Sequence, residues 1–170
     1  NARHDREALD ALRALHRRAR AYRIVATDLF TLYDGLLVLG ETADAASLHR
    51  LCRTDPDDPP SVWSMKTRLL TVAGEHGAAR HALAQVPPER LEALQHDRDY
   101  PGTLGALTHA ALALAAHDYL EALYPLLYAL RDRFAVHMSL VCEGSLDYLC
   151  GEIAMALGKD GLAHQHFAAG

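Results

Sequence analysis

The stretch LLTVAGEHGAARHAL, residues 69–83, decides the fold because it reads as two helices joined by a glycine turn. Its first part is apolar, Gly74 follows, and Ala79 comes five residues after the glycine. Glycine tolerates the left-handed backbone conformation that ends a helix and reverses the chain. An alanine one turn into the next helix lets two antiparallel helices approach closely, because a larger side chain would push them apart. The stretch therefore predicts an α-helical hairpin.

The same layout recurs in three other segments of the chain. They are LLVLGETADAASLHRL (36–51), LALAAHDYLEALYPLL (112–127) and IAMALGKDGLAHQHFAAG (153–170). In these segments the turn residue and its alanine are Gly40 with Ala45, His117 with Ala122, and Gly158 with Ala163. Such self-similarity predicts stacked helix pairs that bury a continuous core. Because His117 replaces the glycine, we expect its turn to have a different geometry.

The apolar periodicity is helical along most of the chain. Apolar residues step by three or four positions in two clear runs, namely Leu104, Leu107, Ala111 and Leu114, and Leu146, Leu149, Ile153 and Leu157. No stretch alternates with a period of two, so we expect no sheet, and the weakly periodic residues 134–144 are predicted to form a loop. The proline-rich segment TDPDDPP (54–60) ends the first third of the chain. The sequence therefore predicts one all-α domain of about four helix pairs over residues 1–170.

Composition and charge favour a cytoplasmic binding domain. The chain has 170 residues, a formal net charge of −5 and 50% hydrophobic residues, as expected of a single globular domain. Three cysteines without a Cys-x-x-Cys pair favour a reducing compartment. No apolar run reaches the ~18 residues of a membrane helix, so no membrane association is expected. The first residue is Asn rather than Met, which fits a fragment of a larger protein.

Positive charge is concentrated in the first predicted helix. Its arginines are Arg3, Arg6, Arg13, Arg17, Arg18, Arg20 and Arg23, while the remainder of the chain is acidic. We interpret them as a solvated face, and direct nucleic-acid contact is not expected. A nucleic-acid contact through Arg13, Arg17 and Arg20 is a weaker alternative, which a steep salt dependence of binding would support.

The repeat layout resembles the tetratricopeptide repeat, whose helix pairs carry a glycine at the turn and an alanine five residues later. The last unit matches best, with Phe167 four residues after Ala163 at a position that is usually aromatic in that repeat. Successive turn residues lie 34, 43 and 41 positions apart, and the first spacing equals the ~34-residue period of the family. The resemblance covers roughly residues 25–170 and implies a right-handed α-solenoid.

The C-terminal half is similar to the helical-repeat region of large bacterial, often actinobacterial, signal-transduction ATPases, including LuxR-type transcriptional regulators and adenylate cyclase-like proteins. The similar motifs are His96-Asp97-Arg98-Asp99-Tyr100, Thr103-Leu104, Ala122-Leu123-Tyr124, Leu126-Leu127, Gly144-Ser145-Leu146-Asp147-Tyr148-Leu149, Ala156-Leu157-Gly158 and His166-Phe167. Two residues depart from the pattern of that family: Tyr100 stands where a tryptophan is usual, and Cys150 stands where a glycine is common. In that family the repeats lie downstream of a nucleotide-binding module and act as a sensor or protein-interaction surface. The chain has no Gly-x4-Gly-Lys-Ser/Thr motif, so the resemblance does not imply nucleotide chemistry.

Seven residues are candidates for partner or ligand binding, some from their places in the predicted repeats and others from the polar group around the loop before residue 100. They are Arg68, Asp97, Asp99, Tyr100, His109, Tyr148 and Glu152. Asp97 and Asp99 with His96 or His109 could act as acid and base, but acidic residues before a helix also stabilise its N-terminus, and we favour that interpretation. The histidine and cysteine spacings match no metal site, so we predict no metal, no cofactor and no catalytic residue set.

The sequence thus favours a non-catalytic protein-interaction or effector-sensing module of a bacterial regulatory protein. Its partner would be a protein, a peptide or another domain of the parent regulator, and a small-molecule effector is compatible with the pattern. The alternative is a standalone helical small-molecule-binding protein or enzyme with a His/Tyr-rich pocket in its C-terminal half. A deep pocket containing His109 and Tyr148, with a shifted histidine pKa, would favour that alternative.

Overall fold

The computed structural model describes the chain at residues 48, 50–53, 58–97, 99–137 and 141–170. The chain divides into two compact units, Asn1–Arg53 and Thr54–Gly170, at the start of the proline-rich segment. Only residues 48 and 50–53 of the first unit are described. The helices and strands with assigned bounds all belong to the second unit.

Two predictions fall in the first unit and lie outside the described residues. One is the arginine-rich first helix. The other is the first repeat turn, for which Gly40 was predicted as the turn residue and Ala45 as the small residue of the following helix. Gly40 and Ala45 therefore stay predictions, and the repeat pattern is compared with the structure at the three later turns.

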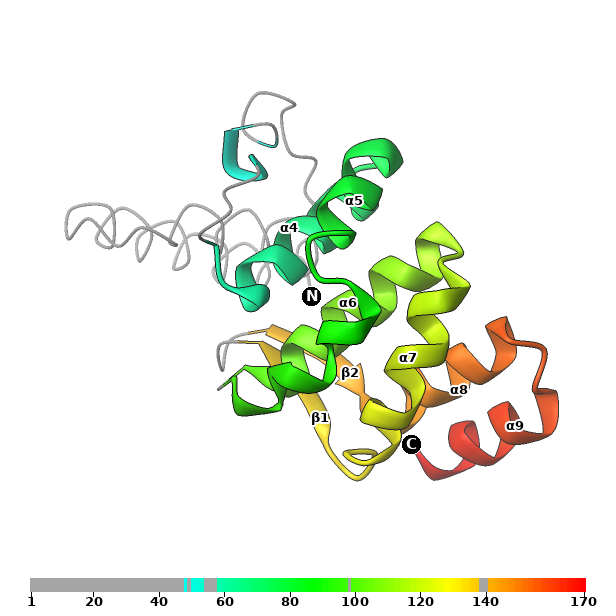
Figure 1. Cartoon of the computed structure of the whole chain (residues 1–170). Helices are drawn as coiled ribbons and strands as arrows, with labels where there is room; N and C mark the ends of the chain where they lie inside the picture. The colour runs from blue at the N-terminus through cyan, green and yellow to red at the C-terminus, as the bar shows by residue number, and fades with distance from the viewer. Residues whose placement is uncertain (1–47, 49, 54–57, 98, 138–140) are drawn as a thin grey trace, which may run out of the picture. The chain divides into compact units, whose positions relative to one another are not determined.

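The helices of the second unit follow one another in antiparallel pairs (Figure 1). The pairs are α4 (Pro60–Val72) with α5 (His76–Leu83), α6 (Tyr100–Leu114) with α7 (His117–Tyr128), and α8 (Leu146–Ala156) with α9 (Asp160–Ala169). Short 3-10 helices, η1 (Pro88–Arg90) and η2 (Glu92–His96), connect α5 to α6. The first helices of the pairs pack side by side, α4 on α6 and α6 on α8, and each second helix packs on its own first helix.

The turns inside the pairs share one left-handed residue, which corrects the predicted role of His117. Gly74 has φ +79°, Gly158 has φ +70° and Ala115 has φ +50°. Each stands two residues before the first residue of the next helix, so His117 begins α7 and Ala115 takes the place of the glycine. Alanine pays roughly 1–2 kcal/mol for this conformation. The turn geometry is therefore kept in the second pair, although the glycine is not.

The small residue of the repeat shifts together with the turn residue. Ala79 and Ala163 are buried five residues after their glycines, as predicted. Five residues after Ala115 comes Leu120, which is fully buried, whereas the predicted Ala122 is only half-buried. The second pair thus packs around a leucine where the others use alanine.

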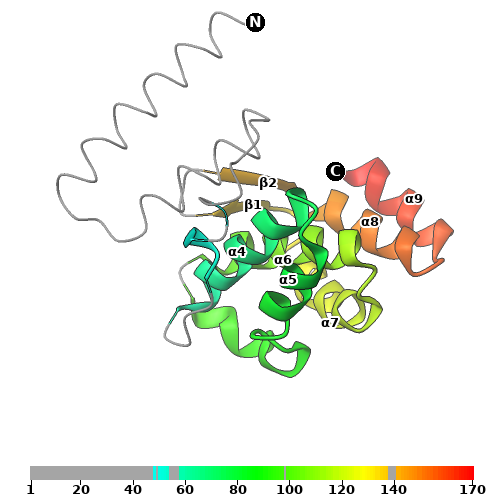
Figure 2. The ribbon, with the colours of Figure 1, turned by 90° about the horizontal axis from the view of Figure 1, so that it is seen from above.

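A β-hairpin lies between α7 and α8, where the sequence predicted a loop and no sheet. Strands β1 (Phe134–His137) and β2 (Val141–Ser145) pair antiparallel and pack on α6, and β2 also touches α8 (Figures 1 and 2). The all-α prediction is therefore wrong in this respect. The described part of the chain is mostly helical, with one small two-stranded sheet.

Two glycines on α6, which have no side chain, explain why so short a hairpin forms here. A Cβ atom on Gly102 would lie 2.6 Å from the carbonyl oxygen of Val136, and one on Gly105 would lie 2.7 Å from Cβ of Ala135. Both distances are shorter than atoms allow, so the strands reach the helix only because these positions are glycine. A contact with a distant segment stabilises the sheet, and strands of four and five residues carry little periodicity of their own.

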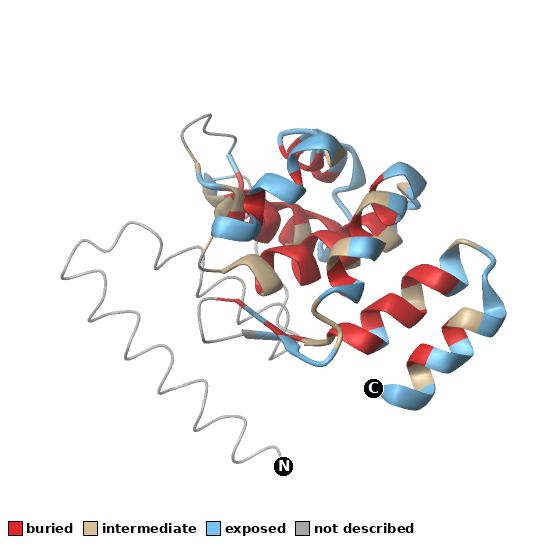
Figure 3. Cartoon of the chain, turned by 60° about the horizontal axis from the view of Figure 1, so that its bottom comes forward, coloured by how far each residue is buried: buried red, intermediate tan, exposed pale blue. Residues whose placement is uncertain are grey.

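The core follows the predicted helical stripes. Leu104, Leu107, Leu146 and Leu149 are at most 2% exposed, and Figure 3 shows buried residues on the facing sides of the helices. Helix α6 is buried on almost every side, since it contacts α4, α5, α7, α8 and the hairpin. Among the described residues, no helix combines the length and the apolar character that crossing a membrane requires.

Candidate functional site

A buried glutamate, Glu143, stands at an irregularity of the hairpin. Ala135 pairs with Gly144 and Val136 pairs with Cys142, so Glu143 is the extra residue of a β-bulge. Gly144 follows it with φ +116°, a conformation that favours glycine. Bulges redirect side chains, and here the Glu143 side chain is only 2% exposed. The hairpin therefore carries a carboxyl group into the protein.

The first helices supply the polar side chains around this carboxyl group. Nε of Arg68 on α4 lies 3.7 Å from Oε2 of Glu143, and Nε2 of His109 on α6 lies 3.8 Å from the same oxygen. Glu152 on α8 interacts electrostatically with Arg68. We refer to Arg68, His109, Glu143 and Glu152 as the Glu143 site.

The tautomer of His109 follows from its hydrogen bond. Its Nε2 lies 2.8 Å from the backbone carbonyl oxygen of Glu143. A carbonyl oxygen only accepts, so Nε2 carries the proton and donates it. In the neutral ring Nδ1 is then an acceptor. His109 thus attaches α6 to the backbone of β2.

Hydrogen bonding within the Glu143 site is incomplete. Among the described residues, Nε of Arg68, Oε1 of Glu143 and Oε2 of Glu152 are buried and have no hydrogen-bond partner. A buried polar atom without a partner costs about 1–3 kcal/mol. Polar atoms separated by more than 3.5 Å are often bridged by water or by a ligand atom. The site therefore has three buried polar atoms whose hydrogen bonds a water molecule or another polar species would have to supply.

Burial shifts the protonation equilibria of the site toward neutral forms. It raises the pKa of Glu143 to about 7 and, with Arg68, lowers the pKa of His109. Burial also raises the pKa of Glu152, an effect that Arg68 offsets in part. Near neutral pH, Glu143 is thus close to half-protonated beside a neutral histidine. Carboxyl groups poised in this way are frequent at functional sites.

The structure brings together three of the residues proposed from the sequence, namely Arg68, His109 and Glu152, and adds Glu143, which sequence reasoning missed. The one feature of the sequence that could have indicated Glu143 is that it is the only charged residue in the run Val141-Cys-Glu-Gly, inside the segment predicted to be a loop. A carboxylate between residues typical of a strand requires a partner or a function.

Asp97 and Asp99 lie at the start of α6, away from His109. Oδ1 of Asp97 accepts a hydrogen bond of 2.9 Å from the backbone N–H of Asp99. Their charges act instead on His137 of β1, whose pKa burial lowers and both aspartates partly restore. Nε2 of His137 is 3.2 Å from Oγ of Ser64. Ser64 is fully buried, so this serine–histidine arrangement presents no nucleophile to a substrate and is structural.

The two proposed tyrosines do not join the Glu143 site. Tyr100 is the half-buried first residue of α6, and burial and Glu92 raise its pKa. Tyr148 is 50% exposed and packs its ring 5.2 Å from that of Phe167. The expected pocket that combines His109 with Tyr148 is therefore not formed by these side chains, although the pKa of His109 is shifted.

A second buried polar cluster joins α7, α8 and α9. Nδ1 of His166 lies 3.2 Å from Oδ1 of Asp147, and its Nε2 lies 2.9 Å from the hydroxyl oxygen of Tyr124. Both ring nitrogens are thus engaged. We refer to Asp147, His166 and Tyr124 as the His166 relay; it accounts for the buried histidine in the last helix.

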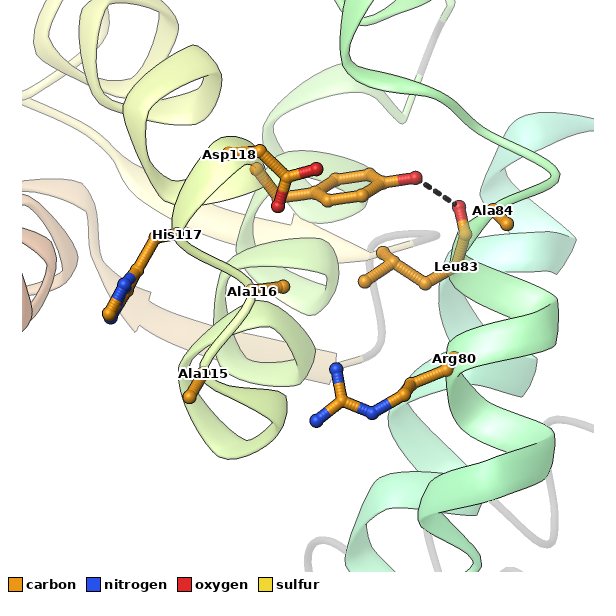
Figure 4. Close-up of a pocket in the computed structure, with 8 residues that line it drawn as sticks. Arg80, Leu83, Ala84, Ala115, Ala116, His117 and Asp118 are labelled. Carbon is orange, nitrogen blue, oxygen red and sulfur yellow. Dashed lines mark hydrogen bonds between the residues drawn. The ribbon is translucent and has the colours of Figure 1, made fainter.

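A pocket of about 350 Å³ lies beside the turn between α6 and α7 (Figure 4). Arg80 reaches across from α5, and its Nη2 donates to the carbonyl oxygen of Leu114 at 2.7 Å. The Tyr119 hydroxyl donates to the carbonyl oxygen of Leu83 at 2.9 Å. These bonds attach the α4–α5 pair to the α6–α7 pair, so Arg80 and Tyr119 have structural roles in the pocket.

Among the described residues, no group of three His, Cys, Asp or Glu side chains is placed to hold a metal ion. Comparisons of the chain with protein-family models, with curated proteins and with solved structures found no match. The arguments for function therefore rest on the Glu143 site and on the arrangement of the helices.

Proposed function

We propose that this chain is a helical-repeat module of a bacterial regulatory protein that senses an effector through the Glu143 site. The carrying observation is that Arg68 of α4 and His109 of α6 lie 3.7 and 3.8 Å from Oε2 of the buried Glu143, while Glu152 of α8 interacts electrostatically with Arg68. Buried atoms of Arg68, Glu143 and Glu152 have no hydrogen-bond partner among the described residues. A species bound there would contact all three pairs at once. Small movements between the pairs could then pass a signal to the rest of a regulator.

The repeat architecture supports this proposal. Successive helix pairs share the same left-handed turn residue and pack first helix on first helix. A stack of this kind, continued into a right-handed superhelix of about four pairs, is the arrangement of the tetratricopeptide-like family. In such stacks the first helices line the face that receives a partner. Cytoplasmic location and a role in transcriptional regulation belong to the same proposal.

The burial of the site favours a small effector over an extended peptide. Glu143 is 2% exposed, and the side chains of Arg68 and His109 are 20% and 22% exposed. A peptide groove needs exposed side chains along its length, whereas a small polar molecule or ion can satisfy isolated buried atoms. A protein partner or another regulator domain would then receive the signal rather than fill the site.

Thermal stability of the full chain in the presence of small polar metabolites tests the proposal. A true effector should raise the melting temperature, because binding to the folded state alone stabilises it. The Arg68→Met variant should lose this response. Arg90→Met, at an exposed arginine of η1, is the matched control and should keep it. If no compound stabilises the chain, or if all three proteins respond alike, this site does not sense an effector.

One observation favours a second function, an enzyme that uses the same site. Glu143, with a pKa near 7, stands beside neutral His109, and such pairs can transfer protons in general acid–base catalysis. Turnover of a bound compound would support this alternative, provided that Glu143→Gln abolishes turnover and leaves binding in place. Binding without turnover would support the sensor.

A further inference from the structure

The β1–β2 hairpin occupies the face formed by the first helices. Its strands pack on α6, β2 reaches α8, and the ring of His137 reaches Ser64 of α4 at 3.2 Å. Under the proposed function this face holds the Glu143 site. The hairpin belongs to neither helix of a pair, yet it covers part of this face and supplies Glu143 to the site.

Glu143 is the charged side chain that the hairpin places against this face. Among the described residues, Arg68 from α4 and His109 from α6 face Glu143, and Glu152 from α8 interacts electrostatically with Arg68. From β1, the inward titratable group is His137, whose ring is directed to Ser64. Gly105 of α6 leaves the space that the Glu143 side chain fills, since a Cβ there would lie 2.9 Å from Cβ of Glu143.

The protonated and ionised forms of Glu143 fit this place differently. The neutral acid can remain buried with few partners. The carboxylate needs several hydrogen bonds, yet Oε1 has no partner among the described residues and the Arg68 guanidinium is 3.7 Å from Oε2. Arg68 is also attracted by Glu152, so its charge is shared. Ionisation therefore favours a movement of the hairpin that admits water to the carboxylate.

We propose that the β1–β2 hairpin is a proton-controlled latch on the first-helix face, seated while Glu143 is protonated and loosened when Glu143 ionises. This inference rests on the proposed function for the meaning of the face, and it names the proton as an effector of the Glu143 site. A loosened hairpin uncovers α6 and frees Arg68 to change its partner. The latch acts near neutral pH, where Glu143 titrates.

Amide hydrogen exchange in the full chain tests the latch. Protection factors of the β1 and β2 amides, corrected for the intrinsic pH dependence of exchange, are compared at pH 6.5 and pH 8.5. Because the pKa of Glu143 is about 7 when the hairpin is seated and about 4.5 when the side chain is exposed, we expect protection to fall by about fourfold at the higher pH. His109 and His137 have lowered pKa values and stay neutral across this window, so the change would report on Glu143.

Variants separate the latch from general effects of pH. Glu143→Gln mimics the neutral acid and should keep the hairpin equally protected at both pH values. Glu121→Gln, at an exposed glutamate of α7, is the matched control and should behave as the unmodified chain. Unchanged protection in the unmodified chain, or the same loss in Glu143→Gln, would overturn the latch.

A direct titration covers the case in which Glu143→Gln does not fold. The side-chain carboxyl carbon of Glu143, followed by NMR in the unmodified chain, should titrate near pH 7 together with the β1 and β2 amides. Titration near the ordinary glutamate value of about 4.5 would overturn the proposal. If the hairpin loosens with pH but the chain binds no effector or partner, the latch stands and the proposed function fails. If an effector binds while the hairpin stays protected at both pH values, the proposed function stands and the latch fails.

Discussion

The chain contains two buried polar clusters that differ in how completely their hydrogen bonds are made. In the His166 relay, both ring nitrogens of the histidine are engaged, by Asp147 and by Tyr124. In the Glu143 site, buried atoms of Arg68, Glu143 and Glu152 lack partners among the described residues. A completed network stabilises one conformation, whereas an incomplete one leaves a cost that a ligand or a movement can relieve. The contrast indicates a structural role for the first cluster and makes the second the candidate functional site.

The largest expected effect comes from breaking the completed cluster. His166→Ala leaves Asp147 buried with its partner removed and deletes the contact with Tyr124, so the free energy of unfolding should fall by about 3 kcal/mol. Chemical denaturation at neutral pH measures this loss. His164→Ala, at an exposed position two residues away on α9, is the control and should change stability little. Equal stability of the two variants would show that the relay does not hold α7, α8 and α9 together.

A substitution in the incomplete cluster, the Glu143 site, should raise the free energy of unfolding instead of lowering it. Between about pH 4.5 and 7 the folded state keeps a proton on Glu143 that the unfolded chain has lost, so this group lowers the free energy of unfolding as pH rises through that window. Glu143→Gln removes the loss and should make the chain more stable at pH 8 by about 2 kcal/mol, with no such gain near pH 4. Denaturation curves of both proteins at several pH values check this. His109 and His137 are present in both proteins, so their contributions cancel. A variant that is less stable than the unmodified chain at pH 8 would contradict the assignment.

A loss of stability of intermediate size is expected at Gly105, where the hairpin packs on α6. Gly105→Ala places a Cβ 2.7 Å from Cβ of Ala135, so the strands must move away and the free energy of unfolding should fall by about 1.5 kcal/mol. Loss of amide protection in β1 and β2 should accompany the change. Gly161→Ala, at an exposed site of α9 with open space around it, is the control and should be neutral or slightly stabilising. A hairpin still protected in Gly105→Ala would show that the glycine is not required.

The smallest expected effect comes from removing the hydrogen bond between Tyr124 and His166 in the His166 relay. Tyr124→Phe removes one hydroxyl group and leaves Nε2 of His166 without its bond, which should cost about 1 kcal/mol. Tyr128→Phe, at an exposed neighbouring ring on the same helix, is the control and should cost less. A loss in the Tyr128 variant as large as that in the Tyr124 variant would point to ring packing rather than to the hydrogen bond.

Much of the helical architecture was predictable from local patterns. The stripe at Leu104–Leu114 is buried as expected, the one at Leu146–Leu157 is buried except for its half-buried last residue, and Gly74 and Gly158 are left-handed turn residues. Both follow from interactions within a few residues, namely side-chain periodicity and backbone sterics. The turn at Ala115 was predicted two residues too late, at His117, because the sequence around an alanine does not indicate that it adopts the left-handed conformation usual for glycine.

The candidate site was predictable only in part. Arg68 and Glu152 were chosen as polar residues on predicted first helices, and His109 as a candidate acid–base residue beside Asp97 and Asp99. The structure places Arg68 and His109 at Glu143, and Glu152 interacts with Arg68. Glu143 was missed because its burial depends on a bulge in a hairpin that the periodicity did not reveal. Tyr148 was chosen by the same reasoning and lies elsewhere, since its ring packs on Phe167.

The sequence by itself determined the helix pairs, because each pair is specified by contacts within about 30 residues and by a turn whose backbone needs are local. Only the tertiary structure decided the hairpin, the burial of Glu143 and the meeting of Arg68, His109 and Glu152. These depend on glycines at 102 and 105 that leave room for strands some 30 residues further along the chain. Long-range packing of this kind overrides local propensity and leaves no periodic signal in either segment.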